Sequence, residues 1–191
     1  MKIIQENEYL DIMENEAEPY LRAHCQDGYI PGAEDIYHGK NGITGKIHVQ
    51  RYLAENPKGV VVISHGFTEG APKYDEMIYY FLQAGYHVYM SEHMGHGQSY
   101  RLTAAPSLVH IDIWKRYVRD FLKVCHKIKK AHPDLPLHLF AHSMGGAIGA
   151  IAAAWESALF HKVILSSPMI KPLTGGVPWP LTVLIAHAEC L

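Results

Sequence analysis

The pattern of hydrophobic and polar positions changes character near residue 54. From there on, short apolar runs typical of strands buried on both faces alternate with longer stretches of helical character. The strands are predicted at residues 60–63, 86–90, 137–140 and 163–165, and the helices at 74–83, 110–130 and 144–155. In the longest helix the apolar stripe is predicted to run from Trp114 through Phe121 to Ile128. This alternation predicts βαβ units in an α/β fold, with a mostly parallel, doubly wound sheet.

The two ends of the chain follow other patterns. Residues 6–24 predict a helix that Pro19 breaks or kinks, and the glycine-rich stretch 28–45 contains a predicted hairpin turn at 40–42. Residues 46–53 alternate like a strand. The tail is rich in proline and glycine and then apolar, which resembles the start of an inserted helical flap. We therefore expect residues 1–167 to form the N-terminal part of a core and residues 168–191 to begin a lid.

Composition narrows the class of protein. The 191 residues are 48% hydrophobic and 19% charged, which is ordinary for one globular domain. With 17 basic and 19 acidic residues and a net charge of −2, nothing points to a nucleic-acid partner. The acidic residues gather at the start, at Glu6, Glu8, Asp11, Glu14, Glu16 and Glu18. A solvated helix face is the simpler interpretation of this cluster, and an acidic docking surface is the alternative.

Cysteines and apolar runs bear on the compartment. Cys25, Cys125 and Cys190 are odd in number and widely spaced, as expected for reduced thiols in a cytoplasmic protein. No apolar run follows Lys2, so we expect no signal peptide. No stretch reaches the roughly 18 apolar residues of a membrane span, so we expect at most peripheral membrane contact.

Ser143 is the candidate nucleophile. It lies in the sequence Ala-His-Ser-Met-Gly at 141–145, between a predicted strand and a predicted helix, and this resembles the nucleophile elbow G-x-S-x-G. A serine on such a turn projects its oxygen above the sheet edge, and the helix N-terminus offers N–H groups to a developing anion. Ser64 begins a second S-x-G but is followed by a loop. A serine that merely caps the helix is the structural alternative.

The loops after two other strands complete the candidate site. We assign an oxyanion hole to the backbone N–H groups of Phe67 and Met144. In folds with a nucleophile elbow, one donor follows the elbow serine and the other comes from a loop after a neighbouring strand, here the 60–63 strand. The accompanying site-loop residues are His65, Gly66, His96 and His142. His93 and His96 have the spacing of a metal-binding pair, but no third ligand follows at a suitable spacing, so we expect no metal.

Three motifs in order resemble the monoacylglycerol lipase and lysophospholipase branch of the α/β-hydrolases. They are His65-Gly66 with Glu69 and Tyr74 following, the loop Gly-His-Gly-Gln-Ser at 95–99, and His-Ser-Met-Gly-Gly at 142–146. The resemblance covers about residues 35–170. Glu92 and Met94 stand where that branch has Asp and Arg, so an ion pair between these positions is absent and the loop lacks that anchor.

The resemblance implies hydrolysis of a carboxylic ester, a monoacylglycerol or lysophospholipid, through an acyl-enzyme and without a cofactor. Ser143 would attack the carbonyl, a histidine would take its proton, and an acid would orient that histidine. The apolar tail would begin a lid over the acyl chain. Two alternatives stay open: an esterase, thioesterase or peroxidase-like hydrolase of small substrates, and a non-catalytic fragment or pseudoenzyme that retains the fold for binding.

The other two members of a catalytic triad have no good candidates. In this fold the acid and the histidine follow the serine in the chain. After Ser143 the acids are Glu156 and Glu189, and the histidines are His161 and His187; none falls at a predicted strand end facing Ser143. We therefore expect a C-terminally truncated chain that lacks the triad acid and histidine and has little turnover alone.

Overall fold

A single mixed sheet organises the protein. The computed structural model describes residues 3–33, 45–171 and 178. Within them six strands follow the order β1-β2-β4-β3-β5-β6. The strands are β1 (Cys25–Pro31), β2 (Lys46–Tyr52), β3 (Val60–Ser64), β4 (His87–Ser91), β5 (Leu137–His142) and β6 (Lys162–Ser166). β2 pairs antiparallel with β1 and β4, and the other neighbours are parallel, which confirms the predicted α/β class.

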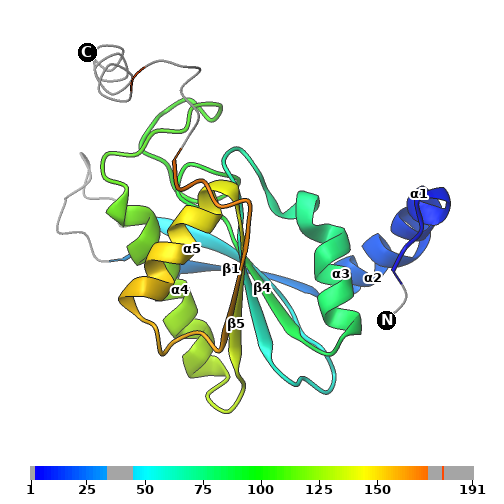
Figure 1. Ribbon diagram of the computed structural model, residues 1–191. Coiled ribbons are helices and arrows are strands. Elements are labelled where there is room, and N and C mark those ends of the chain that lie inside the picture. The colour runs from blue at the N-terminus through cyan, green and yellow to red at the C-terminus, as the bar shows by residue number, and fades with distance from the viewer. Residues whose placement is uncertain (1–2, 34–44, 172–177, 179–191) are drawn as a thin grey trace.

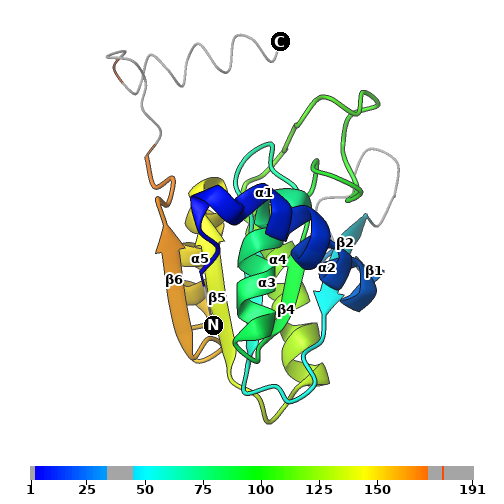
Figure 2. The same cartoon turned by 90° about the vertical axis from the view of Figure 1, so that its right-hand side faces the viewer.

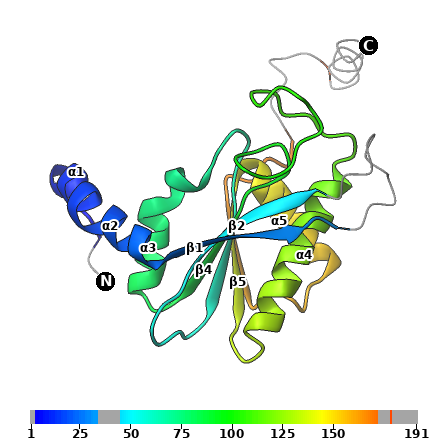
Figure 3. The ribbon, with the colours of Figure 1, turned by 180° about the vertical axis from the view of Figure 1, so that it is seen from behind.

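Helices cover both faces of this sheet. α4 (Lys115–Ala131) and α5 (Ser143–Trp155) lie on one face, and α3 (Asp75–Gln83) lies on the other (Figure 1). A short helix, η3 (Ala71–Tyr74), leads into α3. The N-terminal segment lies beyond α3 on the same side (Figure 2). It consists of η1 (Glu6–Glu8), α1 (Tyr9–Ile12), the π-helix η2 (Met13–Ala17) and α2 (Glu18–His24). Figure 3 shows the two helical layers separated by the sheet from behind.

The central strand shows why the sheet needs both layers. All five residues of β3 are buried, and successive side chains of a strand point to opposite faces. Val60 and Val62 belong to the core cluster on the α4–α5 face, whereas Val61 and Ile63 belong to the cluster on the α3 face. A continuous apolar run is therefore what this position requires.

The first strand is an element that the sequence pattern does not predict, and it overlaps the start of the glycine-rich stretch 28–45. β1 pairs with β2 from Cys25↔Tyr52 to Pro31↔Lys46. It is an edge strand with mostly exposed or half-exposed side chains, so it shows no apolar periodicity. Packing does not require a glycine at position 28, because a Cβ there would meet nothing within 4 Å. The predicted turn at 40–42 lies outside the described residues.

Two predicted helices differ from the structure, one at its start and one in its interior. α4 begins at Lys115 rather than residue 110, and Trp114 is its N-cap, 52% exposed, rather than part of the buried stripe. The N-terminal helix is irregular before Pro19, at the π-turn of η2, while Pro19 occupies the first turn of α2, where no backbone donor is needed. Most of the predicted lid, after residue 171, lies outside the described residues.

Candidate active site

Ser143 stands at the junction of β5 and α5. His142, the last residue of β5, is extended, with φ −122° and ψ 140°, and Ser143 has φ 50°. The left-handed region is uncommon for residues other than glycine and costs about 1–3 kcal/mol. β5 lies between β3 and β6, with Ala141 opposite Ser64 and His142 opposite Ser166. The serine therefore occupies a strained turn at the carboxyl ends of three adjacent parallel strands.

Glycine lets the start of α5 approach the loop after β3. A Cβ on Gly145 would lie 2.2 Å from the carbonyl oxygen of Ser64 and 2.4 Å from that of His65. The hydroxyl of Ser64 donates a hydrogen bond to the Gly145 carbonyl at 3.1 Å. The first turn of α5, whose N–H groups lack intrahelical partners, is thus in direct contact with the segment that leads to Phe67.

His65 shapes that segment without being free to act as a base. Its side chain is fully buried; Nδ1 lies 2.7 Å from the Gly66 carbonyl oxygen, and the backbone N–H of His93 donates to Nε2 at 2.9 Å. These partners fix the neutral tautomer with the proton on Nδ1. Burial lowers the pKa of His65 to about 4, despite its bond to Gly66. Both ring nitrogens are in structural use.

The neutral, buried ring of His65 should make the unfolding free energy of the protein depend on pH. Because the folded-state pKa lies below the unfolded value, stability from His65 is fully present above about pH 6.5 and is lost as pH falls toward 4. We expect the loss of unfolding free energy between pH 7 and pH 5 to be about 2 kcal/mol smaller in His65→Asn than in the wild type. Urea unfolding at both pH values measures this. An equal pH dependence of the wild type and His65→Asn would refute it. The control is His110→Asn, at an exposed loop position, which should keep the wild-type pH dependence.

Glu69 is a site residue to which the sequence analysis gave no role. Its carboxylate accepts from the backbone N–H of Gly66 at 2.7 Å and from the Tyr74 hydroxyl at 2.6 Å, and it pairs with Lys73. Nε2 of His142, which precedes the candidate nucleophile, lies 3.6 Å from it. Although burial opposes ionisation, the bonds from Lys73, Tyr74 and Gly66 lower the pKa of Glu69 to about 2. An ionised carboxylate therefore holds the 66–74 turn against His142.

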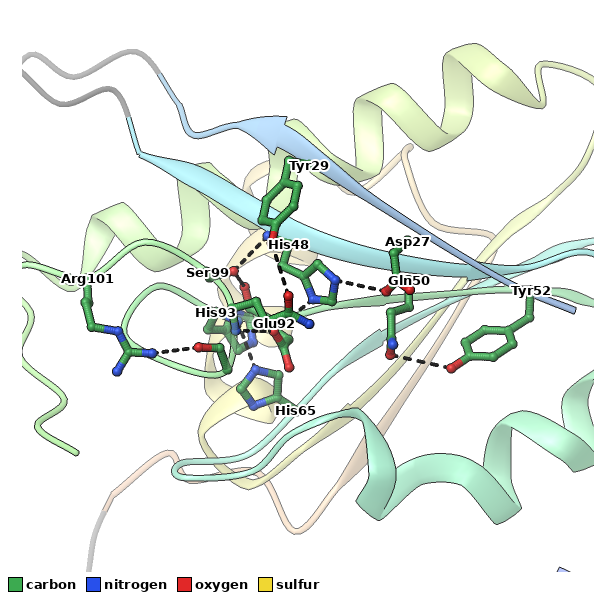
Figure 4. A network of polar contacts seen from close by, with 12 residues as sticks. Asp27, Tyr29, His48, Gln50, Tyr52, His65, Glu92, His93, Ser99 and Arg101 are labelled. Atoms are coloured by element: carbon green, nitrogen blue, oxygen red, sulfur yellow. Dashed lines mark hydrogen bonds and ion pairs between the residues drawn. The ribbon is translucent and has the colours of Figure 1, made fainter. Parts of the chain in front are cut away.

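The loop after β4 is anchored, contrary to what the missing Asp–Arg pair implied. Nδ1 of the buried His48 lies 2.9 Å from the Glu92 carboxylate, and its Nε2 lies 3.0 Å from Asp27 (Figure 4). The backbone N–H of Gln98 donates to the same Glu92 carboxylate at 2.7 Å. Met94 is fully buried in the α4–α5 core. A histidine of β2 thus supplies the partner that the loop was expected to lack.

Ser99 closes this loop from its other end. Its hydroxyl donates to the Glu92 carbonyl at 2.6 Å and accepts from the backbone N–H of His48 at 2.9 Å. Gly97 has φ 46°, and a Cβ there would lie 2.1 Å from the Glu92 carboxyl carbon. The glycine is therefore required for the turn to wrap around the carboxylate.

His93 and His96 serve this loop rather than a recognisable metal site. Nε2 of His93 lies 2.9 Å from the Ser64 hydroxyl, and Nδ1 of His96 lies 3.0 Å from the Met94 carbonyl oxygen. The His96 ring meets the Phe67 ring edge-on at 5.7 Å. Within residues 3–33 and 45–171, no group of three or more His, Cys, Asp or Glu side chains could hold a metal ion.

The candidate triad partners that lie in the described part of the chain are remote from Ser143. Glu156, just past the C-terminal end of α5, pairs with His126 at 2.8 Å. His161, just before β6, packs against His138 with ring centroids 5.4 Å apart. Since Ser143 begins α5 and follows β5, both groups lie at the opposite ends of these elements. Of the predicted site residues, His65 lies against the first turn of α5 through Gly145, Gly66 and His142 meet at Glu69, and the His96 ring contacts the rings of His65 and Phe67.

Comparison with known proteins agrees with this geometry. Residues 55–188 match the family described as serine aminopeptidase, S33. The chain is 37% identical to rat monoglyceride lipase over 114 residues, and 33% identical to lysophospholipase L2 of Escherichia coli K12 over 119 residues. These matches cover 60% and 62% of this chain but only 36% and 35% of the relatives. The chain thus spans about a third of their length.

A solved structure extends the likeness to the fold. The carboxyl esterase of Bacillus coagulans superimposes with a TM-score of 0.62 at 27% identity, covering 74% of this chain and 43% of the esterase. The match to the family covers more than half of the chain, including every strand from β3 to β6. The protein is homologous to lipid ester hydrolases. The chain belongs to the serine aminopeptidase S33 family of the α/β-hydrolases.

Proposed function

We propose that Ser143 is the nucleophile of a hydrolase that cleaves carboxylic esters of lipids. The observation that carries this proposal is the positive φ of a serine between β5 and α5, beside a glycine that touches the loop after β3. A serine that only capped the helix would need no such strain, because N-cap residues ordinarily have extended φ and ψ. Strain of this kind clusters at functional sites.

The arrangement supports acyl transfer in two steps. The Ser143 oxygen attacks the ester carbonyl carbon, the carbonyl oxygen becomes an anion, and the N–H groups of Phe67 and Met144 receive it. The alcohol then leaves with a proton, and water cleaves the acyl-enzyme to the fatty acid. Each donor of such a hole is worth about 10²–10³ in kcat. The Gly145 contact supports this assignment, since it holds the two donor segments together.

The proton transfers require groups that the described residues do not bring to Ser143. Glu156 and His161 are engaged elsewhere, and His65 is bonded through both ring nitrogens. We infer that an acid and a histidine outside residues 3–33 and 45–171 complete the triad, in the chain order of this fold. Without them the oxyanion hole and binding alone leave about 10³–10⁴-fold catalysis over water.

The substrate class is proposed as monoacylglycerol or lysophospholipid. The names of the rat and Escherichia coli relatives support this choice. Residues 1–167 would supply the core, and residues 168–191 would begin a lid over the acyl chain. Cys25 and Cys125 are free thiols, which is consistent with the proposed cytoplasmic location.

Substrate profiling tests the proposed class. We expect the 191-residue chain to release fatty acid from monooleoylglycerol or lysophosphatidylcholine in preference to hydrolysing p-nitrophenyl acetate. We also expect a rate at least about 10³-fold below that of intact rat monoglyceride lipase assayed in parallel, because none of the described residues supplies a base to Ser143. Hydrolysis confined to the acetate ester would favour the small-substrate alternative. A rate equal to the intact lipase would contradict the inferred site of the base.

A further inference from the structure

A strongly basic helix covers one face of this nearly neutral protein. Seven of the 17 residues of α4 are Lys or Arg, and Asp120 is its acidic residue. Five of the cations recur at intervals of three or four residues, which places them on one face of the helix. They are Lys115, Arg119, Lys123, Lys127 and Lys130. This set, here called the basic stripe, extends over about 22 Å of the helix.

The charges of the basic stripe are not neutralised within the described residues. No acidic side chain of this part of the chain pairs with Arg119, Lys127 or Lys130. Lys123 donates to a backbone carbonyl, that of Gly32, at 2.6 Å and so keeps its charge. Glu156, the acid that borders the stripe, faces His126 instead. Among the described residues, these cations of the stripe therefore have no acidic partner.

A groove and two exposed indoles accompany this charge. Arg119, Lys123, Lys127 and Lys130 line an open groove of 640 Å³, and Trp155 and Glu156 border it at the end of α5. Trp155 is 47% exposed, and Trp114, 52% exposed, lies beside it with ring centroids 6.2 Å apart. Exposed indoles next to lysines and arginines are typical of segments that lie in a membrane interface.

The opposite layer of the molecule carries the opposite charge. The N-terminal helices, residues 6–24, contain six acids and one Arg, Arg22, which pairs with Glu18 at 3.1 Å. These N-terminal helices lie beyond α3, on the far side of the sheet from α4 and α5 (Figures 1 and 3). An anionic surface would therefore attract the α4–α5 face and repel the other. None of the helices in the described ranges is long and apolar enough to cross a bilayer, so such a contact would be peripheral.

We propose that the α4–α5 face is a docking surface for an anionic phospholipid bilayer. The cations of the basic stripe bind lipid phosphates, and the paired indoles of Trp114 and Trp155 enter the headgroup layer. Juxtamembrane cations contribute additively to binding of anionic lipid, at roughly fivefold each. The inference goes beyond the proposed hydrolysis, and it can be tested by binding alone, without turnover.

Vesicle sedimentation tests this surface. We expect the chain to bind phosphatidylcholine vesicles with 30% phosphatidylserine, to bind pure phosphatidylcholine weakly, and to be released by salt. The triple variant Arg119→Gln, Lys127→Gln, Lys130→Gln should lower the partition coefficient about 100-fold. Lys46→Gln, Lys58→Gln, Lys162→Gln, which removes as many exposed cations elsewhere, should change it less than threefold.

Tryptophan emission gives an independent readout of the same contact. We expect a shift to shorter wavelength on addition of the anionic vesicles, and its loss in Trp114→Phe, Trp155→Phe. Equal losses of binding in the two triple variants would overturn the proposal, because the effect would then be general electrostatics. Binding of duplex DNA through the stripe without binding of the vesicles would also overturn it.

Discussion

Gly145→Ala is expected to destabilise the protein by about 3 kcal/mol or more, an effect at the upper end of overpacking substitutions. The new methyl would overlap the carbonyl oxygens of Ser64 and His65 at 2.2 and 2.4 Å, and these are backbone atoms of a buried strand end. Either α5 or the 64–67 segment must move. The contact that places the two proposed oxyanion donors together would then open, so activity at Ser143 should fall as well.

Urea unfolding followed by far-UV circular dichroism measures this loss. Gly28→Ala is the matched control, because a Cβ at Gly28 meets nothing within 4 Å and its φ is not positive. We expect that control to unfold within about 0.5 kcal/mol of the wild type. A Gly145→Ala protein as stable as the Gly28→Ala protein would contradict the close packing of α5 on the β3 loop.

Ser143→Ala is expected to abolish covalent labelling by a fluorophosphonate probe. The probe phosphonylates a serine hydroxyl, and the proposed oxyanion donors assist that step at Ser143. Because the described residues bring no general base to Ser143, we expect the labelling of the wild type to be slow and the labelling of the variant to be absent. Mass spectrometry of the labelled wild type should locate the phosphonyl group on the peptide that contains Ser143. The folded state of the variant should be unchanged, since alanine removes only the hydroxyl.

Ser64→Ala is the informative control, since Ser64 begins the second S-x-G of the chain. The Ser64 hydroxyl is buried and bonded to His93 and to the Gly145 carbonyl, so it is closed to a probe. Its removal should reduce stability by about 1–3 kcal/mol but retain the label. Labelling that survives Ser143→Ala and disappears in Ser64→Ala would show that Ser64 is the reactive serine and would contradict the proposal.

The buried part of the fold could be predicted because burial leaves a pattern. β3 and β4 are fully buried, and each contains an apolar run, Val60–Ile63 in β3 and Val88–Met90 in β4. β1 is an exposed edge strand held by backbone pairing to β2, so its side chains carry no such signal. The start of α4 was predicted too early because Trp114 fits the periodicity, although it lies exposed at the N-cap.

In the site, local motifs could be predicted from the sequence, whereas contacts between residues far apart in the chain could not. The Ser143 elbow and the His65-Gly66 loop are local motifs with their own strand and helix context. The contact of His48 with Glu92 joins residues 44 positions apart, and no spacing rule predicts it. The role of Glu69 was readable in principle, because Gly66, Glu69 and Lys73 are spaced at three and four residues. This spacing does not by itself show that the turn wraps around the carboxylate, which depends on the folded conformation.

The reactivity of Ser143→Cys toward a p-nitrophenyl ester tests the central claim most directly, because a thiolate attacks without a general base. Cys125 is buried, and burial raises the thiol pKa of both Cys25 and Cys125. With the oxyanion donors in place, the introduced thiol should be acylated about 100-fold faster than the thiol of Ser107→Cys, on an exposed loop. Equal acylation rates for the two variants would contradict an elbow that shares its anion site with residue 67.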